Sequence, residues 1–338
     1  MEPEKSHGGH GRDSEKIRML RLHRMMVTIR ATEDALADEV KKGEIGCPVH
    51  LYSGEEAVAT GVCDVLRVDD WVYSSHRSHG HYLAKGGDLY RLMAEVYCRS
   101  EGCSKGRGGS MHLSSPEIGF PGSSAIVSGS ISLAVGTALA FSLKKTNRVA
   151  ATFFGDGAMG EGVMYESLNL AALYSLPLIF VCENNLYSTH LPISKCLANV
   201  RIAPKARAMG VPAITVDGND VMKVQVAAKR AIAKARRGDG PAFIECLTYR
   251  HRGHVGPNYD VEKGLRSQEE LDSWLKRCPI CTLEKRMIGS NYATKKELAA
   301  ITAEVNKLVL STRQEAKRCG WPHGPEETEF RGVFRGSV

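Results

Sequence analysis

The stretch RVAATFFGDGAMGEGVMYESLNLAALYSLPLIFVCENN, residues 148–185, decides the fold. It begins and ends with two short apolar runs, residues 148–154 and 178–182, which are typical of fully buried strands. Between them, residues 161–174 carry apolar side chains at helical spacing. A buried strand, a helix and a second buried strand make a βαβ unit, which predicts a parallel sheet.

The same alternation continues on both sides of this unit. Further strands are predicted over residues 213–216 and 242–247, with a helix over residues 221–237 between them. We therefore expect an α/β fold with a mostly parallel sheet, and right-handed crossovers that place helices on both faces. Helical N- and C-terminal extensions are predicted over residues 14–42 and after the N-cap residues Ser267 and Thr294.

A further helix start is predicted near residue 53. Ser53-Gly54-Glu55-Glu56 has the Ser-x-x-Glu spacing of a capping box and leads into an apolar run. The segment before it, which contains His50, is therefore expected to be a loop next to a helix N-terminus.

Composition and charge exclude several classes of protein. The chain has 338 residues and a formal net charge of +7, and its basic residues are interspersed with acids rather than gathered with aromatic residues. No nucleic-acid groove is expected from such a pattern. No apolar stretch reaches the roughly 20 residues that cross a bilayer, so no membrane association is expected.

The 10 cysteines indicate a reducing compartment, since they are scattered among apolar neighbours and the start of the chain lacks an apolar signal segment. We expect a cytoplasmic protein without disulfides. The only tight pair, Cys278-Pro279-Ile280-Cys281, has no second pair or nearby histidines, and it offers too few ligands for structural zinc.

Polar side chains follow both strands of the βαβ unit. Asp156 comes directly after the first strand, and Asn184 and Asn185 come directly after the second. Parallel strands place these side chains at one edge of the sheet, where open α/β sheets bind ligands. Carboxylate and amide oxygens suit magnesium, and the glycines around Asp156 leave room for phosphate groups. The competing interpretation is a glycine-rich turn with a helix-capping Asp.

Gly155-Asp156-Gly157 followed by Asn184-Asn185 resembles the thiamine diphosphate motif. The run from residue 155 to 188 resembles the alpha chain of the first, decarboxylating component of two-subunit 2-oxo acid dehydrogenase complexes. Other blocks resemble this family in its order, namely CPVHLYSGEEAVATGV, SSHRSHGHYLAKG, GCSKGRGGSMHL, SSAIVSGSISLAVGTALA and TYRHRGHVGP. The resemblance covers roughly residues 17–310, nearly the whole chain.

The resemblance implies thiamine diphosphate and Mg²⁺ as cofactors. It implies that magnesium is bound by the side chains of Asp156 and Asn185 and by the backbone carbonyl of Tyr187. Backbone groups of the Gly155–Ala158 turn, with N–H groups at Gly157 and Ala158, would meet the diphosphate. The remaining cofactor-binding residues implied by the resemblance are Arg77, Ala125, Val127, His254 and His76, which stands at a position that is usually tyrosine in this family.

Three histidines match family positions around cofactor and substrate, namely His50, His79 and His254. We expect them to be catalytic, because an imidazole transfers protons near neutral pH. For His79 a purely structural role is the alternative. Two acids near the start of the central helix, Glu161 and Glu166, are interpreted as favourable charges at a helix N-terminus rather than as an acid/base pair.

The resemblance also implies a partner. In this family the glutamate that activates the cofactor belongs to a separate beta subunit, so the chain is expected to work in an alpha2-beta2 heterotetramer. The implied reaction is decarboxylation of a 2-oxo acid such as pyruvate, or cleavage of acetoin, with transfer of the two-carbon unit to a lipoyl group on an acyltransferase core.

Two alternatives remain open. One is a carboligase that transfers a two-carbon unit from pyruvate to a ketone, aldehyde or sugar acceptor without lipoamide. The other is a scaffold subunit that has lost the cofactor, against which the intact Asp156, Asn185 and Arg77 argue.

The expected domain organisation is the same for each of these functions. We expect a mobile tail over residues 1–15, one catalytic domain with its helical extensions over residues 16–310, and a C-terminal tail over residues 311–338.

Overall fold

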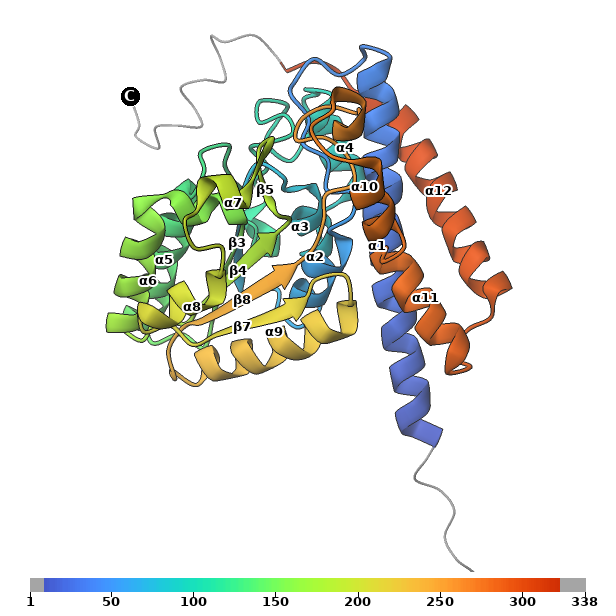
Figure 1. Ribbon diagram of the computed structural model, residues 1–338. Helices are drawn as coiled ribbons and strands as arrows, with labels where there is room; N and C mark the ends of the chain where they lie inside the picture. The colour runs from blue at the N-terminus through green and yellow to red at the C-terminus, as the bar shows by residue number, and fades with distance from the viewer. Residues whose placement is uncertain (1–8, 323–338) are drawn as a thin grey trace, which may run out of the picture.

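The centre of the chain is a six-stranded parallel sheet, seen in a computed structural model that describes residues 9–322 (Figure 1). Its strand order is β2-β1-β3-β4-β8-β7. The strands are β1 (Trp71–Ser74), β2 (Gly122–Ser123), β3 (Ala150–Gly155), β4 (Leu178–Asn184), β7 (Ala213–Asp217) and β8 (Ala242–Leu247). A short antiparallel pair, β5 (Tyr187–Ser188) and β6 (Leu191–Pro192), stands beside it. The predicted parallel α/β sheet is confirmed.

Helices surround the sheet and extend beyond it at both ends of the described chain. They are α1 (Gly9–Lys41), α2 (Glu56–Cys63), α3 (His79–Ala84), α4 (Leu89–Val96), α5 (Gly129–Leu143), α6 (Gly162–Leu173), α7 (Ile193–Cys196), α8 (Ile202–Ala208), α9 (Val221–Arg236), α10 (Gln268–Leu275), α11 (Pro279–Gly289) and α12 (Lys295–Arg318). Single 3₁₀ turns occur at η1 (Pro116–Ile118), η2 (Asp156–Gly160) and η3 (Asp260–Lys263). None of the helices in residues 9–322 is long and apolar enough to cross a membrane.

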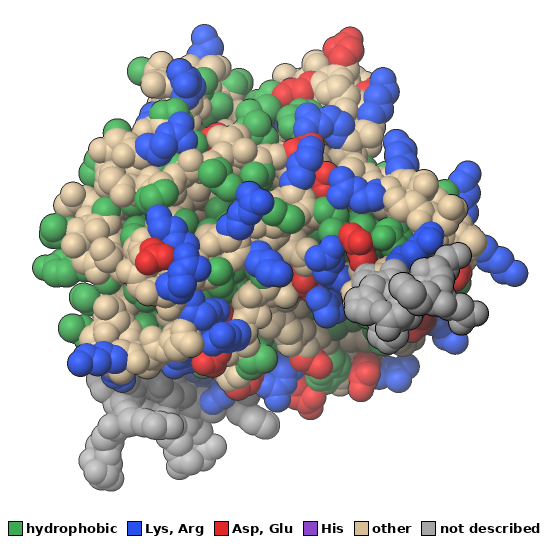
Figure 2. All heavy atoms as spheres, turned by 90° about the horizontal axis from the view of Figure 1, so that it is seen from below, with side chains coloured by type: hydrophobic (Ala, Val, Ile, Leu, Met, Phe, Trp, Pro, Cys, Tyr) green, Lys and Arg blue, Asp and Glu red, His purple; other side chains and the backbone are tan. Residues whose placement is uncertain are grey.

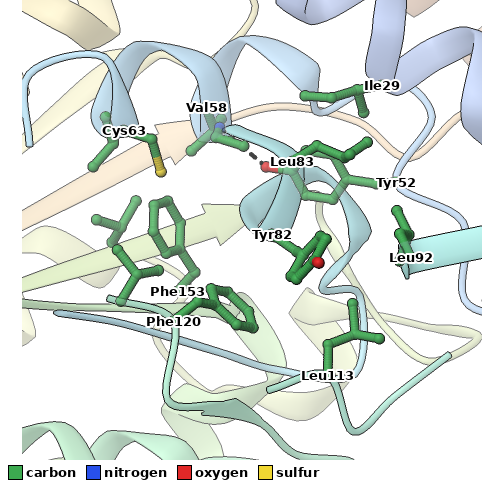
Figure 3. Packing of buried hydrophobic residues seen from close by; sticks show 14 of the residues in the cluster. Ile29, Tyr52, Val58, Cys63, Tyr82, Leu83, Leu92, Leu113, Phe120 and Phe153 are labelled. Atoms are coloured by element: carbon green, nitrogen blue, oxygen red, sulfur yellow. Dashed lines mark hydrogen bonds between the residues drawn. The ribbon is translucent and has the colours of Figure 1, made fainter. Parts of the chain in front are cut away.

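Side chains of the central strands alternate between two apolar cores, because successive residues of a strand point to opposite faces of the sheet. In β4, Phe180 packs with α5, α6 and α8, whereas its neighbours Ile179 and Val181 pack with α2 and α9. In β3, Phe154 belongs to the same core as Phe180, and Phe153 belongs to the same core as Ile179 and Val181. Figure 3 shows part of the second core around Phe153. Burial on both faces explains why these strands are continuous apolar runs.

The βαβ unit that decides the fold forms as predicted, with shifted boundaries. Strand β3 begins at Ala150 rather than residue 148, and the turn η2 separates it from α6. Strands β3 and β4 pair in parallel from Ala150 opposite Leu178 to Gly155 opposite Glu183. This register places the residues that follow the two strands next to each other.

Two of the three predicted helix caps are confirmed. The Ser267 hydroxyl accepts a hydrogen bond from the Glu270 N–H (3.1 Å), and Thr294 with Glu297 forms a complete capping box. The predicted box at Ser53 is wrong. Helix α2 begins at Glu56 with Glu55 as its N-cap residue, and the Ser53 hydroxyl is buried without a hydrogen-bond partner among the described residues.

The physical reason is an ion pair that competes for Glu56. Its carboxylate accepts hydrogen bonds from the Arg30 guanidinium (2.6 Å) and from the Gly54 N–H (3.0 Å). Arg30 belongs to α1, so a contact between distant segments overrides the local signal.

The two terminal extensions pack against each other. Helices α1 and α12 are neighbours on the right of Figure 1. Helix α1 begins at Gly9, inside the predicted tail, and α12 continues to Arg318, beyond residue 310. Residues 1–8 and 323–338 of the two predicted tails lie outside the described residues. The domain boundaries stay a prediction.

A buried carboxylate joins α1 to α12. Glu39 is 1% exposed and forms ion pairs with Lys317, with Arg313 (3.3 Å) and with Lys42 (2.9 Å). Burial opposes ionisation of Glu39, but hydrogen bonds from Lys317, Lys42 and Tyr97 outweigh it and lower the pKa of this carboxyl to about 2. The charged form of Glu39 therefore stabilises the folded chain.

We expect Glu39→Gln to reduce the free energy of unfolding by about 3 kcal/mol at pH 7, because it leaves partly buried cations unpaired. The pKa of an unfolded Glu is ~4.3, above the folded value, so the contribution of Glu39 to stability is complete above that pH and is lost as the pH falls toward 2. Urea unfolding at pH 7, 4 and 3 measures this. Glu44→Gln removes an exposed partner of Lys317 and should cost less than ~1 kcal/mol. If Glu39→Gln and Glu44→Gln reduce the free energy of unfolding equally, the stabilising role of the buried Glu39 carboxylate is contradicted.

Candidate functional site

A cavity opens at the carboxyl edge of the sheet, where β3 and β4 end. It is lined from loops and strand ends that lie far apart in the sequence. The lining residues are His50, Glu55, Ser75, His76, Arg77, Met111, Ala125, Val127, Ser128, Phe154, Gly155, Asp156, Gly157, Ala158, Glu183, Asn185, Tyr187, Ser188, Thr189, Arg250 and His254. Every predicted site residue except His79 is among them.

Asp156 is the least satisfied polar group of this cavity. Its side chain is 1% exposed, and both carboxylate oxygens lack a hydrogen-bond partner among the described residues. Burial raises the pKa of Asp156 to about 7, which the nearby backbone N–H groups of Asp156 and Asn185 offset only in part. A buried carboxylate of this kind costs free energy unless a cation or a donor reaches it.

The other two predicted metal ligands lie in the same cavity. The Asn185 amide donates to Glu55 Oε1 (3.1 Å), which fixes the orientation of the amide, and its Oδ1 accepts from the Tyr187 N–H (3.3 Å). Carboxylate, amide and carbonyl oxygens are the hard ligands that Mg²⁺ prefers. Together with the unpartnered oxygens of Asp156, this donor set fits a divalent cation.

Residues in and next to the turn η2 form one wall of the cavity. Gly155, Gly157 and Ala158 all line it. A Cβ on Gly157 would lie 2.6 Å from Ser188 Oγ, so only glycine fits at this position without a shift. The turn leads into α6, and backbone N–H groups before a helix are well suited to phosphate oxygens.

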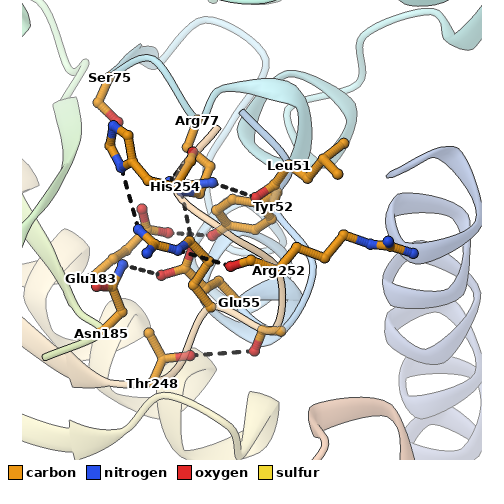
Figure 4. Close-up of polar contacts among 12 residues, drawn as sticks. Leu51, Tyr52, Glu55, Ser75, Arg77, Glu183, Asn185, Thr248, Arg252 and His254 are labelled. Carbon is orange, nitrogen blue, oxygen red and sulfur yellow. Dashed lines mark hydrogen bonds and ion pairs between the residues drawn. The ribbon is translucent and has the colours of Figure 1, made fainter. Parts of the chain in front are cut away.

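Arg77 links three walls of the cavity (Figure 4). Its guanidinium donates to the backbone carbonyls of Leu51 (2.5 Å) and His254 (3.2 Å), and its Nε lies 3.5 Å from Glu55 Oε2. Burial lowers the pKa of Arg77, while the carboxylates of Glu55 and Glu183 raise it. An arginine has five N–H donors, so these contacts leave donors for a ligand.

Three imidazoles gather beside Arg77. The rings of His50, His76 and His254 stand edge to face, with centroids 4.7 Å apart for His50 and His76 and 5.1 Å for the other two pairs. Burial, followed by the charge of Arg77, lowers the pKa of His50 and His76 to about 3 and that of His254 to about 2. These histidines are therefore neutral at pH 7.

His79 lies outside the cavity. Its ring is fully buried, with Nδ1 3.1 Å from the Glu33 carboxylate and Nε2 2.9 Å from Ser110 Oγ. Ser110 Oγ also accepts from the His50 N–H (3.4 Å). The contacts of His79 thus hold the loop that carries His50. Its catalytic role stays a prediction.

Ala125, Val127 and Met111 line the cavity, and the predicted contact of Ala125 and Val127 with a cofactor ring stays a prediction. Apolar side chains form a suitable wall for a planar ring. Neither Glu161 nor Glu166 lines the cavity. Glu161 is the N-cap residue of α6, although its side chain makes no capping hydrogen bond, and Glu166 lies beyond the first turn of the helix, so the interpretation as an N-terminal charge is wrong for Glu166.

Sequence reasoning missed Glu55, Glu183 and Arg250. Glu183 lines the cavity and accepts a hydrogen bond from the Tyr52 hydroxyl (Figure 4). Its carboxylate also lies 2.9 Å from His81 Nε2. Burial and the charge of Glu183 raise the pKa of Glu55 to about 7. The sequence contains one feature that could have identified Glu183 as a site residue, because it is an acid at the end of an otherwise apolar strand.

Arg250 adds a second guanidinium to the site. It pairs with Asp260 (2.8 Å), and its Nη1 lies 3.3 Å from His254 Nδ1. Its position in TYRHRGHVGP, four residues before His254, was the signal that could have found it.

Comparisons with known proteins agree on one family. A model described as "Dehydrogenase E1 component" matches residues 24–324. The alpha subunit of acetoin:2,6-dichlorophenolindophenol oxidoreductase from Bacillus subtilis is 46% identical over 233 residues, which cover 69% of this chain and 70% of the relative. The pyruvate dehydrogenase E1 component subunit alpha of Porphyra purpurea is 41% identical over 297 residues, covering 86% of each chain. The acetoin subunit alpha of Cupriavidus necator is 37% identical over 314 residues, covering 93% of each.

Proposed function

The chain belongs to the dehydrogenase E1 component family, and from this premise we propose that it is the alpha subunit of a thiamine diphosphate-dependent 2-oxo acid dehydrogenase. The reported relatives are alpha subunits named for pyruvate dehydrogenase or for acetoin oxidoreductase. The reaction is therefore decarboxylation of pyruvate or a related 2-oxo acid, or cleavage of acetoin. No observation favours the carboligase alternative.

The observation that carries the site assignment is the pair of unpartnered, buried oxygens of Asp156. We propose that Asp156, the Asn185 side chain and the Tyr187 carbonyl hold Mg²⁺. A divalent cation would remove the cost of burying this carboxylate and would bridge to diphosphate oxygens. The amide of Asn185 is already oriented by Glu55.

The diphosphate would meet the backbone N–H groups of Gly157 and Ala158 and the guanidinium of Arg77. His76 and His254 would border it, with Ala125 and Val127 against the aminopyrimidine ring. When bound, thiamine diphosphate supplies the electron sink for decarboxylation. This chain's residues position it, neutralise its charge and exclude water.

Two imidazoles can form hydrogen bonds with a bound group. His50 and His254 line the cavity and are neutral at pH 7, so each has one ring N–H donor and one acceptor nitrogen. Nδ1 of His50 is buried without a hydrogen-bond partner among the described residues, which leaves it available for a substrate or cofactor group.

A beta subunit is the implied partner, because the relatives are named as alpha subunits. We propose that it supplies the activating glutamate in an alpha2-beta2 heterotetramer, and that a lipoyl group of an acyltransferase core accepts the two-carbon unit. Exposed apolar side chains on α5, on α6 and beside them support an extensive protein contact, as the hydrophobic surface on the left of Figure 2 illustrates. They are Ile126, Val127, Leu133, Leu143, Leu170, Leu173 and Tyr174.

Thermal unfolding of this chain mixed with its beta subunit tests the cofactor assignment. We expect thiamine diphosphate with Mg²⁺ to raise the unfolding temperature, since a ligand at 100 times its dissociation constant adds about 2.7 kcal/mol. Thiamine diphosphate with EDTA should give a much smaller shift. Equal shifts with and without Mg²⁺ would contradict the metal site, and no shift in either would contradict the cofactor site.

The substrate needs a separate assay. Release of carbon dioxide and reduction of an artificial acceptor should be compared for pyruvate, branched 2-oxo acids and acetoin. We expect turnover of pyruvate or acetoin. If none of these reduces the acceptor while sugar acceptors are consumed with pyruvate, the carboligase function would replace the dehydrogenase.

A further inference from the structure

A cysteine pair stands at the start of α11, away from the cavity. Cys278 is the N-cap residue of this helix, Pro279 follows at its first position, and Cys281 lies one turn on. Both are free thiols. Cys278 is 7% exposed, whereas Cys281 lies at the surface.

Three features of this position favour a thiolate at Cys278. Cys281 lies three residues after Cys278, in the first turn of the helix that Cys278 caps. Arg30 of α1 points Nη1 at the same sulfur from 4.0 Å. The N-terminus of a helix of 11 residues adds its partial positive charge. Hydrogen bonding from Cys281, the largest influence, and the charge of Arg30 lower the pKa of Cys278, although burial of this thiol opposes them, and the pKa of Cys281 is raised.

Other buried cysteines of the described chain have the opposite environment. Burial raises the pKa of the Cys63, Cys182 and Cys246 thiols, which makes them poor nucleophiles. Cys196 is a lone exposed thiol on α7 and provides an internal reference. The pair on α11 differs from these in having a cationic neighbour, Arg30, and a second thiol three residues away.

We propose that Cys278 and Cys281 form a redox-active dithiol, which a peroxide oxidises to an intramolecular disulfide. The small size of hydrogen peroxide suits a sulfur that is only slightly exposed. Helical residues three apart have Cβ atoms about 5–6 Å apart, whereas a disulfide needs about 3.5–4.5 Å. The backbone of Cys278 is not helical (φ −49°, ψ 128°), so closure of the bond requires this N-cap residue to turn toward Cys281.

The reaction has two balanced steps. The Cys278 thiolate attacks one oxygen of hydrogen peroxide, the O–O bond breaks and hydroxide leaves, which gives a sulfenic acid at Cys278. The Cys281 sulfur then attacks the Cys278 sulfur, the S–O bond breaks, and the departing hydroxyl takes the thiol proton as water. Two thiols and one peroxide yield one disulfide and two waters. An external dithiol reverses it by two exchange steps and is itself oxidised.

Arg30 connects this dithiol to the cavity wall. Its Nε donates to Glu56 Oε1 (2.6 Å), and the same oxygen accepts from the Gly54 N–H (3.0 Å), next to Glu55 in the cavity. Oxidation removes the thiolate charge from one side of Arg30 and leaves Glu56 as its anionic partner. The redox site is thus one ion pair away from the segment that carries Glu55.

Peptide mapping of the full chain tests the proposal. The protein is treated with hydrogen peroxide at pH 7, its free thiols are blocked with N-ethylmaleimide, and it is digested with trypsin. The peptide CPICTLEK, residues 278–285, contains both thiols. We expect it to lose two hydrogens, to take up no label, and to recover both thiols after treatment with a dithiol. Its oxidation should be about tenfold faster than that of Cys196.

Two variants test the roles of Cys278 and Cys281 separately. In Cys281→Ser, oxidation should stop at the sulfenic acid of Cys278, which dimedone traps. Cys278→Ser keeps a good N-cap residue, so it should fold and should leave Cys281 no more reactive than Cys196. The proposal is overturned if the peptide keeps both thiols at peroxide levels that oxidise Cys196, or if Cys281 reacts equally fast in Cys278→Ser.

Discussion

Asp156→Asn is expected to lower the activity of the enzyme assembled with its beta subunit by about 10³-fold or more. The substitution removes the only negative charge among the three proposed metal ligands, and a metal's electrostatic contribution of several kcal/mol corresponds to a rate factor of this size. The asparagine has nearly the same shape, so the cavity walls stay in place. Steady-state assays with saturating thiamine diphosphate and Mg²⁺ measure the loss.

The same variant should not lose stability in the absence of ligand. Both oxygens of Asp156 are buried without a hydrogen-bond partner among residues 9–322, so replacing the carboxylate with a neutral amide removes an unfavourable group. Thermal unfolding without cofactor should show an equal or higher midpoint, and adding Mg²⁺ with cofactor should shift it less than in the original chain. A large fall in the ligand-free midpoint would show that Asp156 is structural instead.

Glu161→Gln is the matched control. Glu161 lies five residues from Asp156 in the same glycine-rich run but does not line the cavity. Its activity should stay within about twofold of the original, as for most surface substitutions. If both variants lose activity equally, the effect belongs to the turn and not to the Asp156 carboxylate.

Arg77→Lys is expected to weaken binding of thiamine diphosphate by about 10²-fold and to reduce the free energy of unfolding by about 2 kcal/mol. Lysine keeps the charge but lacks the planar fork, so it cannot serve two backbone carbonyls and a diphosphate together. Arg77 donates to Leu51 O and His254 O, and each lost bond to a buried carbonyl costs about 1–3 kcal/mol before any compensation. Isothermal titration calorimetry measures the affinity and urea unfolding the stability.

Arg252→Lys is the control for this effect. Arg252 comes from the same segment as His254 but pairs with Asp34 (2.7 Å) and does not line the cavity. It should leave the affinity for thiamine diphosphate unchanged. Unchanged affinity in Arg77→Lys would remove Arg77 from the diphosphate site, whatever happens to stability.

The central βαβ unit was predictable because its signals are local. Each buried strand is a continuous apolar run, and strand direction alone brings Asp156 and Asn185 to one edge of the sheet. The caps at Ser267 and Thr294 are local signals as well, since donor and acceptor are three residues apart.

Contacts between distant segments were not predictable in this way. The Ser53 capping box fails because Arg30 reaches Glu56 from α1. The group formed by Tyr52 and Glu183 joins residues from two segments that no spacing rule relates. His79 matched a motif, but motif position did not reveal that its ring is enclosed by Glu33 and Ser110.

The cavity draws its walls from residues spread between His50 and His254, which is most of the described chain. A partly unfolded form that keeps the sheet but loses any one loop no longer has the complete binding site. Ligand binding therefore stabilises only the complete fold and leaves partly open forms at their original free energy. Cofactor should thus lengthen the lifetime of the native chain against heat and proteases, a form of kinetic stability produced by the distribution of the walls.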